Sequence, residues 1–131
     1  MTGSYKPVGY NSVSPYLVLK DAATTISFIQ QVLAATELFK LQDEQGKIQH
    51  AEYRIDDTVV MLADGGPDWP AQEVHIHVYV PDVDGSYQQA LDAGAISIQA
   101  PVKKDDADKR CGVKDGGGAT WWLGTQVEPR A

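Results

Sequence analysis

The chain has 131 residues, 43% of them hydrophobic and 22% charged, and 18 acidic against 11 basic side chains give a formal net charge of −7. This length supports one compact domain, and the negative charge disfavours nucleic acid and anionic membrane surfaces as partners while favouring a cationic small molecule. The longest apolar run, residues 58–63, is too short to span a bilayer, and the first residues lack the pattern of a secretory signal, so we expect a cytoplasmic protein.

The first predicted module covers about residues 10–64 and reads as a strand, a helix and three further strands. Residues 13–21, "VSPYLVLKD", alternate apolar with other side chains as a half-buried strand does. Apolar residues at helical spacing follow over 26–33, and three strands are predicted over 37–42, 47–55 and 58–63, separated by the turn formers "DEQG" and "DD". A linker rich in glycine and proline, residues 65–73, ends the module.

The second predicted module, about residues 74–128, repeats this order. Residues 74–82, "VHIHVYVPD", overlay on 13–21 without a gap at an offset of 61 residues, and helical spacing follows. Strands are predicted over 95–100, 112–115 and 119–124, with a charged excursion at 101–110. A unit of about 60 residues buries a helix and a sheet poorly by itself, so the two modules are expected to pack together or with a partner chain.

Four segments, "SVSPYLVLKDAATTISFIQQVLAATE", "KIQHAEYRIDDTVVMLAD", "HIHVYVPDVDG" and "GVKDGGGATWWLGTQVE", resemble the vicinal oxygen chelate superfamily (glyoxalase, bleomycin resistance and dioxygenase proteins), within it the PhnB-like group. The resemblance implies an α+β fold of two tandem βαβββ modules that form a U-shaped eight-stranded cup. It also implies a homodimer that binds a small molecule.

Metal-dependent members of this superfamily hold a divalent cation with four side chains of the cup. The resemblance places these positions at Ser14, at Met61 or Leu62, at His75 and at Trp122. Only His75 has the chemistry of a ligand, and one imidazole with an indole opposite does not make such a site. We therefore expect no metal and no cofactor.

Strand alternation, with one reference residue per strand taken from the family, selects the side chains that face the cup. Trp121 is expected in the core, whereas Trp122 either stacks on a flat ligand or closes a dimer interface. Glu52 is expected to pair with Arg54 or a cross-strand partner. The predicted ligand-binding residues are Tyr16, His50, Glu52, Arg54, His75, His77, Tyr79, Trp122 and Gln126.

Two remaining features carry little chemistry. The stretch "GVKDGGGATWWLG" is not a phosphate-binding loop, because no Lys-Ser/Thr pair and no helix follow the glycines; it is predicted to be a tight turn into the last strand. Cys111 is a single thiol, which excludes an internal disulfide, and no base stands near it in the sequence.

The function predicted from these residues is metal-independent binding of a small molecule, an antibiotic or another planar or cationic compound, in an aromatic cup at a dimer interface. One alternative is a metal-free lyase or isomerase that uses His50, His75 or His77 as acid–base groups. Others are a metal-dependent glyoxalase-like enzyme with an atypical site and a structural dimer with a degenerate cup.

Overall fold

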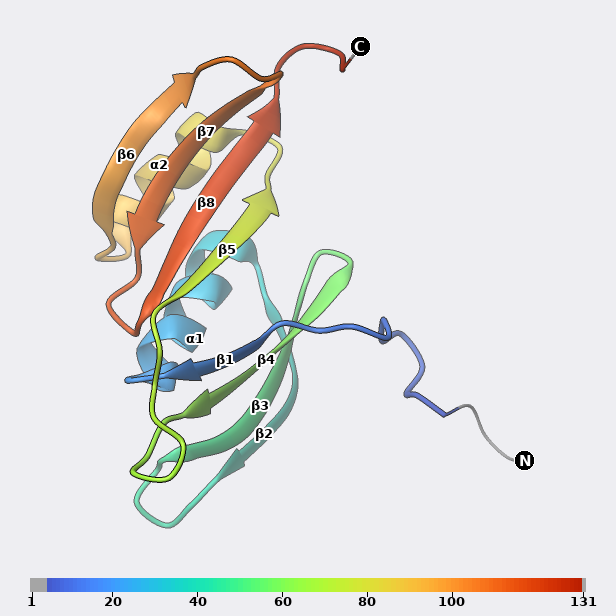
Figure 1. Ribbon diagram of the computed structural model, residues 1–131, viewed down its shortest axis with the longest axis vertical. Helices are drawn as coiled ribbons and strands as arrows, with labels where there is room; N and C mark the ends of the chain where they lie inside the picture. The colour runs from blue at the N-terminus through green and yellow to red at the C-terminus, as the bar shows by residue number, and fades with distance from the viewer. Residues whose placement is uncertain (1–4, 131) are drawn as a thin grey trace.

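The computed structural model describes residues 5–130, which form two helices and eight strands (Figure 1). In chain order the elements are β1 (Tyr16–Leu19), α1 (Ala22–Leu33), β2 (Thr36–Gln42), β3 (Ile48–Ile55), β4 (Thr58–Asp64), β5 (Val74–Tyr79), α2 (Val83–Asp92), β6 (Ile96–Lys103), β7 (Asp108–Lys114) and β8 (Ala119–Gln126). The order is β-α-β-β-β twice, as the sequence repeat predicts.

The strands form two sheets of four with equivalent topology, β1-β4-β3-β2 and β5-β8-β7-β6. In each sheet the first strand of the module pairs in parallel with the last, and all other pairs are antiparallel. Tyr16 lies opposite Met61 in the first sheet, and His77 lies opposite Trp122 in the second, so the same pairing recurs one repeat later. The predicted fold class, two tandem βαβββ modules, is confirmed; the sheets do not close into a barrel.

Helix α1 is the better anchored of the two helices. The Asp21 carboxylate accepts hydrogen bonds from the backbone N–H of Thr24 at 3.2 Å and from the Thr24 hydroxyl at 2.6 Å, which satisfies a free donor of the first turn. The Asp64 carboxylate, at the end of β4, accepts from the Ala22 N–H and the Ile48 N–H. This helix start is therefore fixed to two strands of its own sheet.

The two modules share one hydrophobic core, which lies on the helix side of both sheets. Trp121 of β8 is fully buried and stacks on Phe28 of α1, with ring centroids 5.8 Å apart. Its indole N–H donates to the buried Asp115 carboxylate at 2.9 Å, which also accepts from the Gly117 N–H at 2.7 Å. One carboxylate thus holds the glycine turn and the largest core side chain together.

Several strand boundaries differ from the sequence prediction. Strand β6 continues to Lys103 and β7 begins at Asp108, so much of the stretch expected to be a charged excursion is strand. Strand β7 tolerates its charged residues because they are paired. Arg110 forms ion pairs with Asp108 of the same strand at 2.8 Å and with Asp106, just before the strand, at 3.1 Å. Strand β1 is shorter than the predicted 13–21.

Neither helix in the described part of the chain combines the length and the apolar character needed to cross a membrane.

Candidate functional site

The face of each sheet opposite the helices carries the candidate site residues. We call it the first cup face on β1–β4 and the second cup face on β5–β8. In the first, strand register puts Tyr16, Met61, Glu52 and Phe39 in one row across the sheet. Leu62 lies opposite Leu17 and is fully buried, so Met61 and not Leu62 faces the cup.

Four polar side chains form a continuous hydrogen-bonded chain on the first cup face. The Tyr16 hydroxyl lies 3.0 Å from Nδ1 of His50, and Nε2 of His50 lies 2.7 Å from the Glu52 carboxylate. The other oxygen of Glu52 accepts from the Tyr10 hydroxyl at 2.5 Å. The bond from Tyr10, followed by that from His50, holds the pKa of Glu52 below its usual value despite partial burial. The carboxylate is therefore ionised at neutral pH.

Aromatic rings surround this hydrogen-bonded group of side chains. The Tyr16 ring lies 5.4 Å from the Trp69 ring and 5.5 Å from the His50 ring, and Phe39 lies 5.9 Å from His50 on the other side. Trp69 comes from the segment between β4 and β5 and is half exposed. Flat apolar surfaces with one carboxylate among them suit a planar or cationic group.

The expected pairing of Glu52 with Arg54 or a cross-strand partner is wrong. Arg54 shares the cup face with Glu52 but donates to the backbone carbonyl of Gly9 at 3.1 Å. Gly9 belongs to the segment before β1, which also supplies Tyr10. Glu52 is left to pair with His50 and Tyr10.

A flat aromatic platform lies on the second cup face. The Trp122 and His75 rings are nearly parallel, at 14°, with centroids 6.3 Å apart, and the indole N–H donates to Nδ1 of His75 at 3.1 Å. The indole lies against Gly112, its partner on β7: a Cβ at that glycine would stand 2.5 Å from the ring. The missing side chain of Gly112 therefore allows Trp122 to lie flat on the sheet.

Replacing Gly112 with alanine is expected to lift the indole from the sheet, break its bond to His75 and lower the free energy of unfolding by about 1–3 kcal/mol, because the added methyl overlaps the ring. Near-ultraviolet circular dichroism and urea unfolding measure both effects. Gly66→Ala is the control, since a Cβ there meets only the tip of Lys47. An unchanged tryptophan signal in Gly112→Ala would contradict the platform.

The rest of the second cup face is polar. Arg110 donates from Nε to Nε2 of His77 at 3.0 Å, and Tyr79 donates to Asp108 at 2.7 Å. Burial, and then the positive charge of Arg110, lower the pKa of His77, so this ring is neutral at neutral pH. Gln126, at the end of β8, is exposed. Two groups of predicted residues thus form, one on each sheet.

The four positions that correspond to metal ligands in related proteins do not fit a metal ion. Ser14 and Met61 line one hollow of the first cup face, and His75 and Trp122 are hydrogen-bonded to each other on the second. Thioether and indole are no substitutes for carboxylate and imidazole donors, and the Nδ1 atom of His75 already accepts from Trp122. Within residues 5–130, no three His, Cys, Asp or Glu side chains gather closely enough to hold a metal ion.

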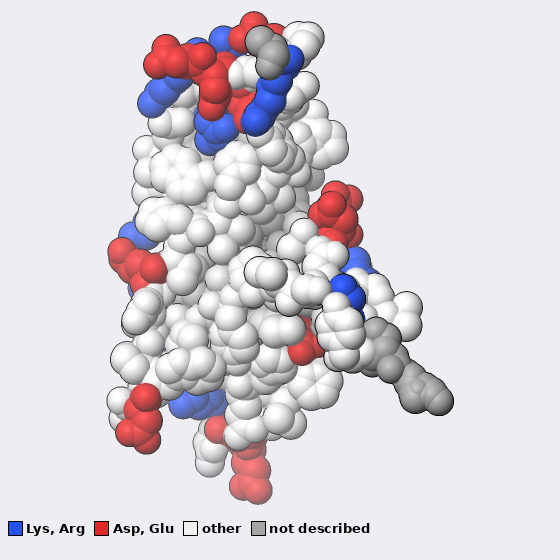
Figure 2. All heavy atoms as spheres, turned by 45° about the vertical axis from the view of Figure 1, so that its right-hand side comes forward, with Lys and Arg blue, Asp and Glu red and all other residues white. Residues whose placement is uncertain are grey.

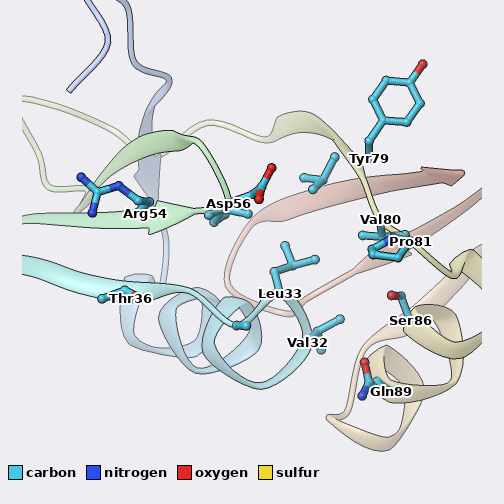
Figure 3. Close-up of a pocket in the computed structure, with 13 residues that line it drawn as sticks. Val32, Leu33, Thr36, Arg54, Asp56, Tyr79, Val80, Pro81, Ser86 and Gln89 are labelled. Atoms are coloured by element: carbon cyan, nitrogen blue, oxygen red, sulfur yellow. The ribbon is translucent and has the colours of Figure 1, made fainter. Parts of the chain in front are cut away.

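A cleft of about 720 Å³ between the modules was not predicted from the sequence (Figure 3). Val32 and Leu33, at the end of α1, face Val80 and Pro81, which follow β5, and Asp56, Ser86 and Gln89 add polar groups. Just over half of the lining residues are aliphatic, and the polar ones come from β2, β3, the β3–β4 turn, β5 and α2. Two of the predicted ligand-binding residues, Arg54 and Tyr79, also line this cleft, whereas the hydrogen-bonded groups around His50 and His77 lie on the cup faces.

Sequence reasoning also missed Tyr10 and Arg110 as members of the two clusters. Tyr10 reaches Glu52 across 42 residues, which no local pattern reveals. Arg110 stands on a strand that its charge made look like a loop. The alternation that placed His77 on the cup face would have included Arg110 had the strand predicted over 112–115 been extended back to Asp108.

The family model of the glyoxalase/bleomycin resistance protein/dioxygenase superfamily matches residues 10–123. The chain belongs to this superfamily. The uncharacterized protein Rv0887c of Mycobacterium tuberculosis is 35% identical over 127 residues, which cover 88% of this chain and 75% of that protein. An uncharacterized protein of Mycobacterium bovis has the same identity, with 84% of its length covered.

Solved structures show the superfamily fold as well. TioX from Micromonospora sp. ML1 superposes with a TM-score of 0.73 at 22% identity, covering 88% of this chain and 98% of TioX. Protein PA1353 of Pseudomonas aeruginosa gives 0.72 at 19%, with coverages of 88% and 98%. The fosfomycin resistance protein FosX of Mesorhizobium loti gives 0.64 at 14%, with 88% and 91%. At these identities the likeness concerns the fold.

Proposed function

We propose that this member of the superfamily is a metal-independent binding protein that holds a planar, cationic small molecule in an aromatic cup. One observation carries the proposal. At the position where metal-dependent relatives keep a carboxylate, the chain has Trp122, laid flat over Gly112 and hydrogen-bonded to His75. A stacking surface stands in place of a ligand set.

Charge supports a cationic ligand. The chain has a formal net charge of −7, which raises the concentration of cations near its surface. Glu52, ionised and framed by Tyr16, Phe39 and Trp69, provides a carboxylate among aromatic faces. A cation over such faces gains about 0.5–2 kcal/mol from each, the upper value when it is desolvated.

A second copy of the chain is proposed to complete the cup. Both cup faces point away from the shared core, and large apolar side chains on them are a third to two thirds exposed, among them Tyr16, Phe39, Leu41 and Tyr79. Figure 2 shows charged groups at the ends and edges of one side of the molecule and a broad uncharged area across its middle. Such an area favours association with another surface.

The finer assignments belong to the same proposal. We place the protein in the PhnB-like group and in the cytoplasm, with sequestration of an antibiotic or a similar compound as its role. FosX is a fosfomycin resistance protein, which supports a resistance-type role for this protein but does not indicate which compound it would bind. The alternative, a metal-free enzyme, is favoured by one observation: His50 is hydrogen-bonded on both sides.

The test uses proflavine, a planar cation, and bleomycin as probes, titrated against tryptophan fluorescence. Trp122→Ala is expected to weaken proflavine binding about tenfold or more. The variant loses the stacking of the cation on the indole, which contributes about 1.4 kcal/mol or more to the binding free energy. Trp122→Phe should keep part of the affinity. Tyr87→Ala is the matched control, because Tyr87 lies on α2, which is on the other side of the sheets from the cup faces, and its hydroxyl donates to Ser97.

Two outcomes would contradict the proposal: neither probe quenches the fluorescence, or Trp122→Ala binds proflavine as tightly as the parent protein. Sedimentation velocity with and without proflavine measures whether the protein is a dimer, as the proposed cup requires. A monomer that binds proflavine at full affinity would overturn the dimeric cup and leave the stacking site in place.

A further inference from the structure

The hydrogen-bonded chain on the first cup face has a fixed direction. The ionised Glu52 carboxylate can only accept hydrogen bonds, so Nε2 of His50 must carry the proton that joins them. In the neutral imidazole Nδ1 then has a lone pair, and the Tyr16 hydroxyl donates to it. The order is hydroxyl, imidazole, carboxylate, with both protons pointing toward Glu52.

This direction leaves the lone pairs of the Tyr16 oxygen for a group in the cup. The side chain is reachable, since Tyr16 is 39% exposed. Burial, and then the charge of Glu52, raise the pKa of Tyr16, so it remains a phenol at neutral pH. It can take up a proton only while passing its own to His50, whose positive charge the Glu52 carboxylate then balances.

The same arrangement activates the nucleophilic serine of unrelated hydrolases, where a carboxylate fixes the histidine tautomer and the histidine takes the hydroxyl proton. The Tyr16 ring lies 5.4 Å from the Trp69 ring, so its phenol can reach the edge of a flat compound stacked on Trp69.

We propose that Tyr16, His50 and Glu52 form a proton relay that removes a proton from the carbon next to the carbonyl of a planar aromatic ketone. The C–H bond breaks, its proton bonds to the Tyr16 oxygen, and the proton of Tyr16 moves to Nδ1 of His50. The electron pair of the C–H bond becomes the C=C bond of an enolate, whose oxygen takes the negative charge. Reversal returns a proton to carbon, so the step is an isomerisation or an exchange without oxidant or cofactor.

The relay rests on the proposed function in one respect, that the cup admits a planar compound. It differs from a general histidine base, because Tyr16 touches the substrate and His50 does not. Tyr16 is thus the catalytic residue, and His50 and Glu52 are positioning residues that accept its proton and fix its direction.

The experiment follows deuterium uptake by 2-indanone, a planar ketone, in D2O by proton nuclear magnetic resonance. The parent protein is expected to accelerate exchange at the carbons next to the carbonyl by about 10²–10⁴ over a buffer control. Tyr16→Phe should return the rate to that of buffer while 2-indanone binds within about threefold of the parent affinity. Glu52→Gln should lower the rate at least tenfold, because an amide no longer fixes the His50 tautomer.

Tyr87→Phe is the matched control, since it also deletes a phenolic hydroxyl but stands on α2, and it should exchange like the parent protein. Exchange that persists in Tyr16→Phe, or 2-indanone that binds without exchange, would overturn the relay while leaving the binding function intact. Failure of 2-indanone to bind overturns the relay for this class of substrate, and the proflavine titration then decides the binding function separately.

Discussion

Replacing Trp121 with alanine is expected to lower the free energy of unfolding by about 3–5 kcal/mol. The side chain is fully buried, stacks on Phe28 across the module boundary and donates to Asp115. Its removal leaves a cavity between the modules and a buried carboxylate with one donor fewer. Urea unfolding followed by far-ultraviolet circular dichroism measures the change.

The control for this prediction is the neighbouring residue. Trp122→Ala removes an indole of the same size from the opposite face of β8, where it is only partly buried, so its cost should be clearly smaller. Trp121→Phe should fall between the two, because it keeps the stacking and loses the hydrogen bond. Equal losses for Trp121→Ala and Trp122→Ala would show that the two tryptophans do not divide between core and cup.

Replacing Gly117 with alanine is expected to cost about 3 kcal/mol or more, although its backbone conformation suits any residue. A Cβ there would stand 2.5 Å from the carbonyl oxygen of Asp21, close to Thr25 as well, at the start of α1. The Asp21 N–H donates to the Gly117 carbonyl, so the two segments cannot separate without losing a bond between modules. Thermal unfolding should show a lowered midpoint.

Gly116→Ala distinguishes the effect of backbone strain from the effect of close packing. At Gly116 the φ angle is +86°, which disfavours alanine, but the nearest atom to a Cβ, on Thr24, is 3.7 Å away. Its cost should therefore be limited to about 1 kcal/mol. If Gly116→Ala destabilises the protein more than Gly117→Ala, conformational strain and not close packing explains the run of three glycines.

Local alternation and the repeat at 61 residues predicted the order of the elements, while the family resemblance supplied the two-module fold and the reference residue that selects the cup face of each strand. The pairs Tyr16–Met61 and His77–Trp122 follow from that repeat. What it could not predict depends on contacts between distant segments, such as Tyr10 with Glu52. Charge also misled: Asp108 and Arg110 look like loop residues until the ion pair that neutralises them is seen.

The cleft of Figure 3 was beyond prediction for a related reason. Its walls come from the end of α1, the start of β2, the end of β3 and the β3–β4 turn in one module, and from the end of β5 and one side of α2 in the other, so the packing of the two modules forms it. Neither module by itself contains all of the walls of this cleft.

The two modules are copies that have become chemically different, and this difference has a consequence for any bound compound. Glu52 and Gly112 lie opposite Met61 and Trp122 in the two sheets, so a polar wall on one copy corresponds to a flat ring on the other. A cup with two identical walls would accept an unsymmetrical compound equally well in two opposite orientations. If the proposed binding function holds, unlike walls select one head-to-tail orientation of the bound compound.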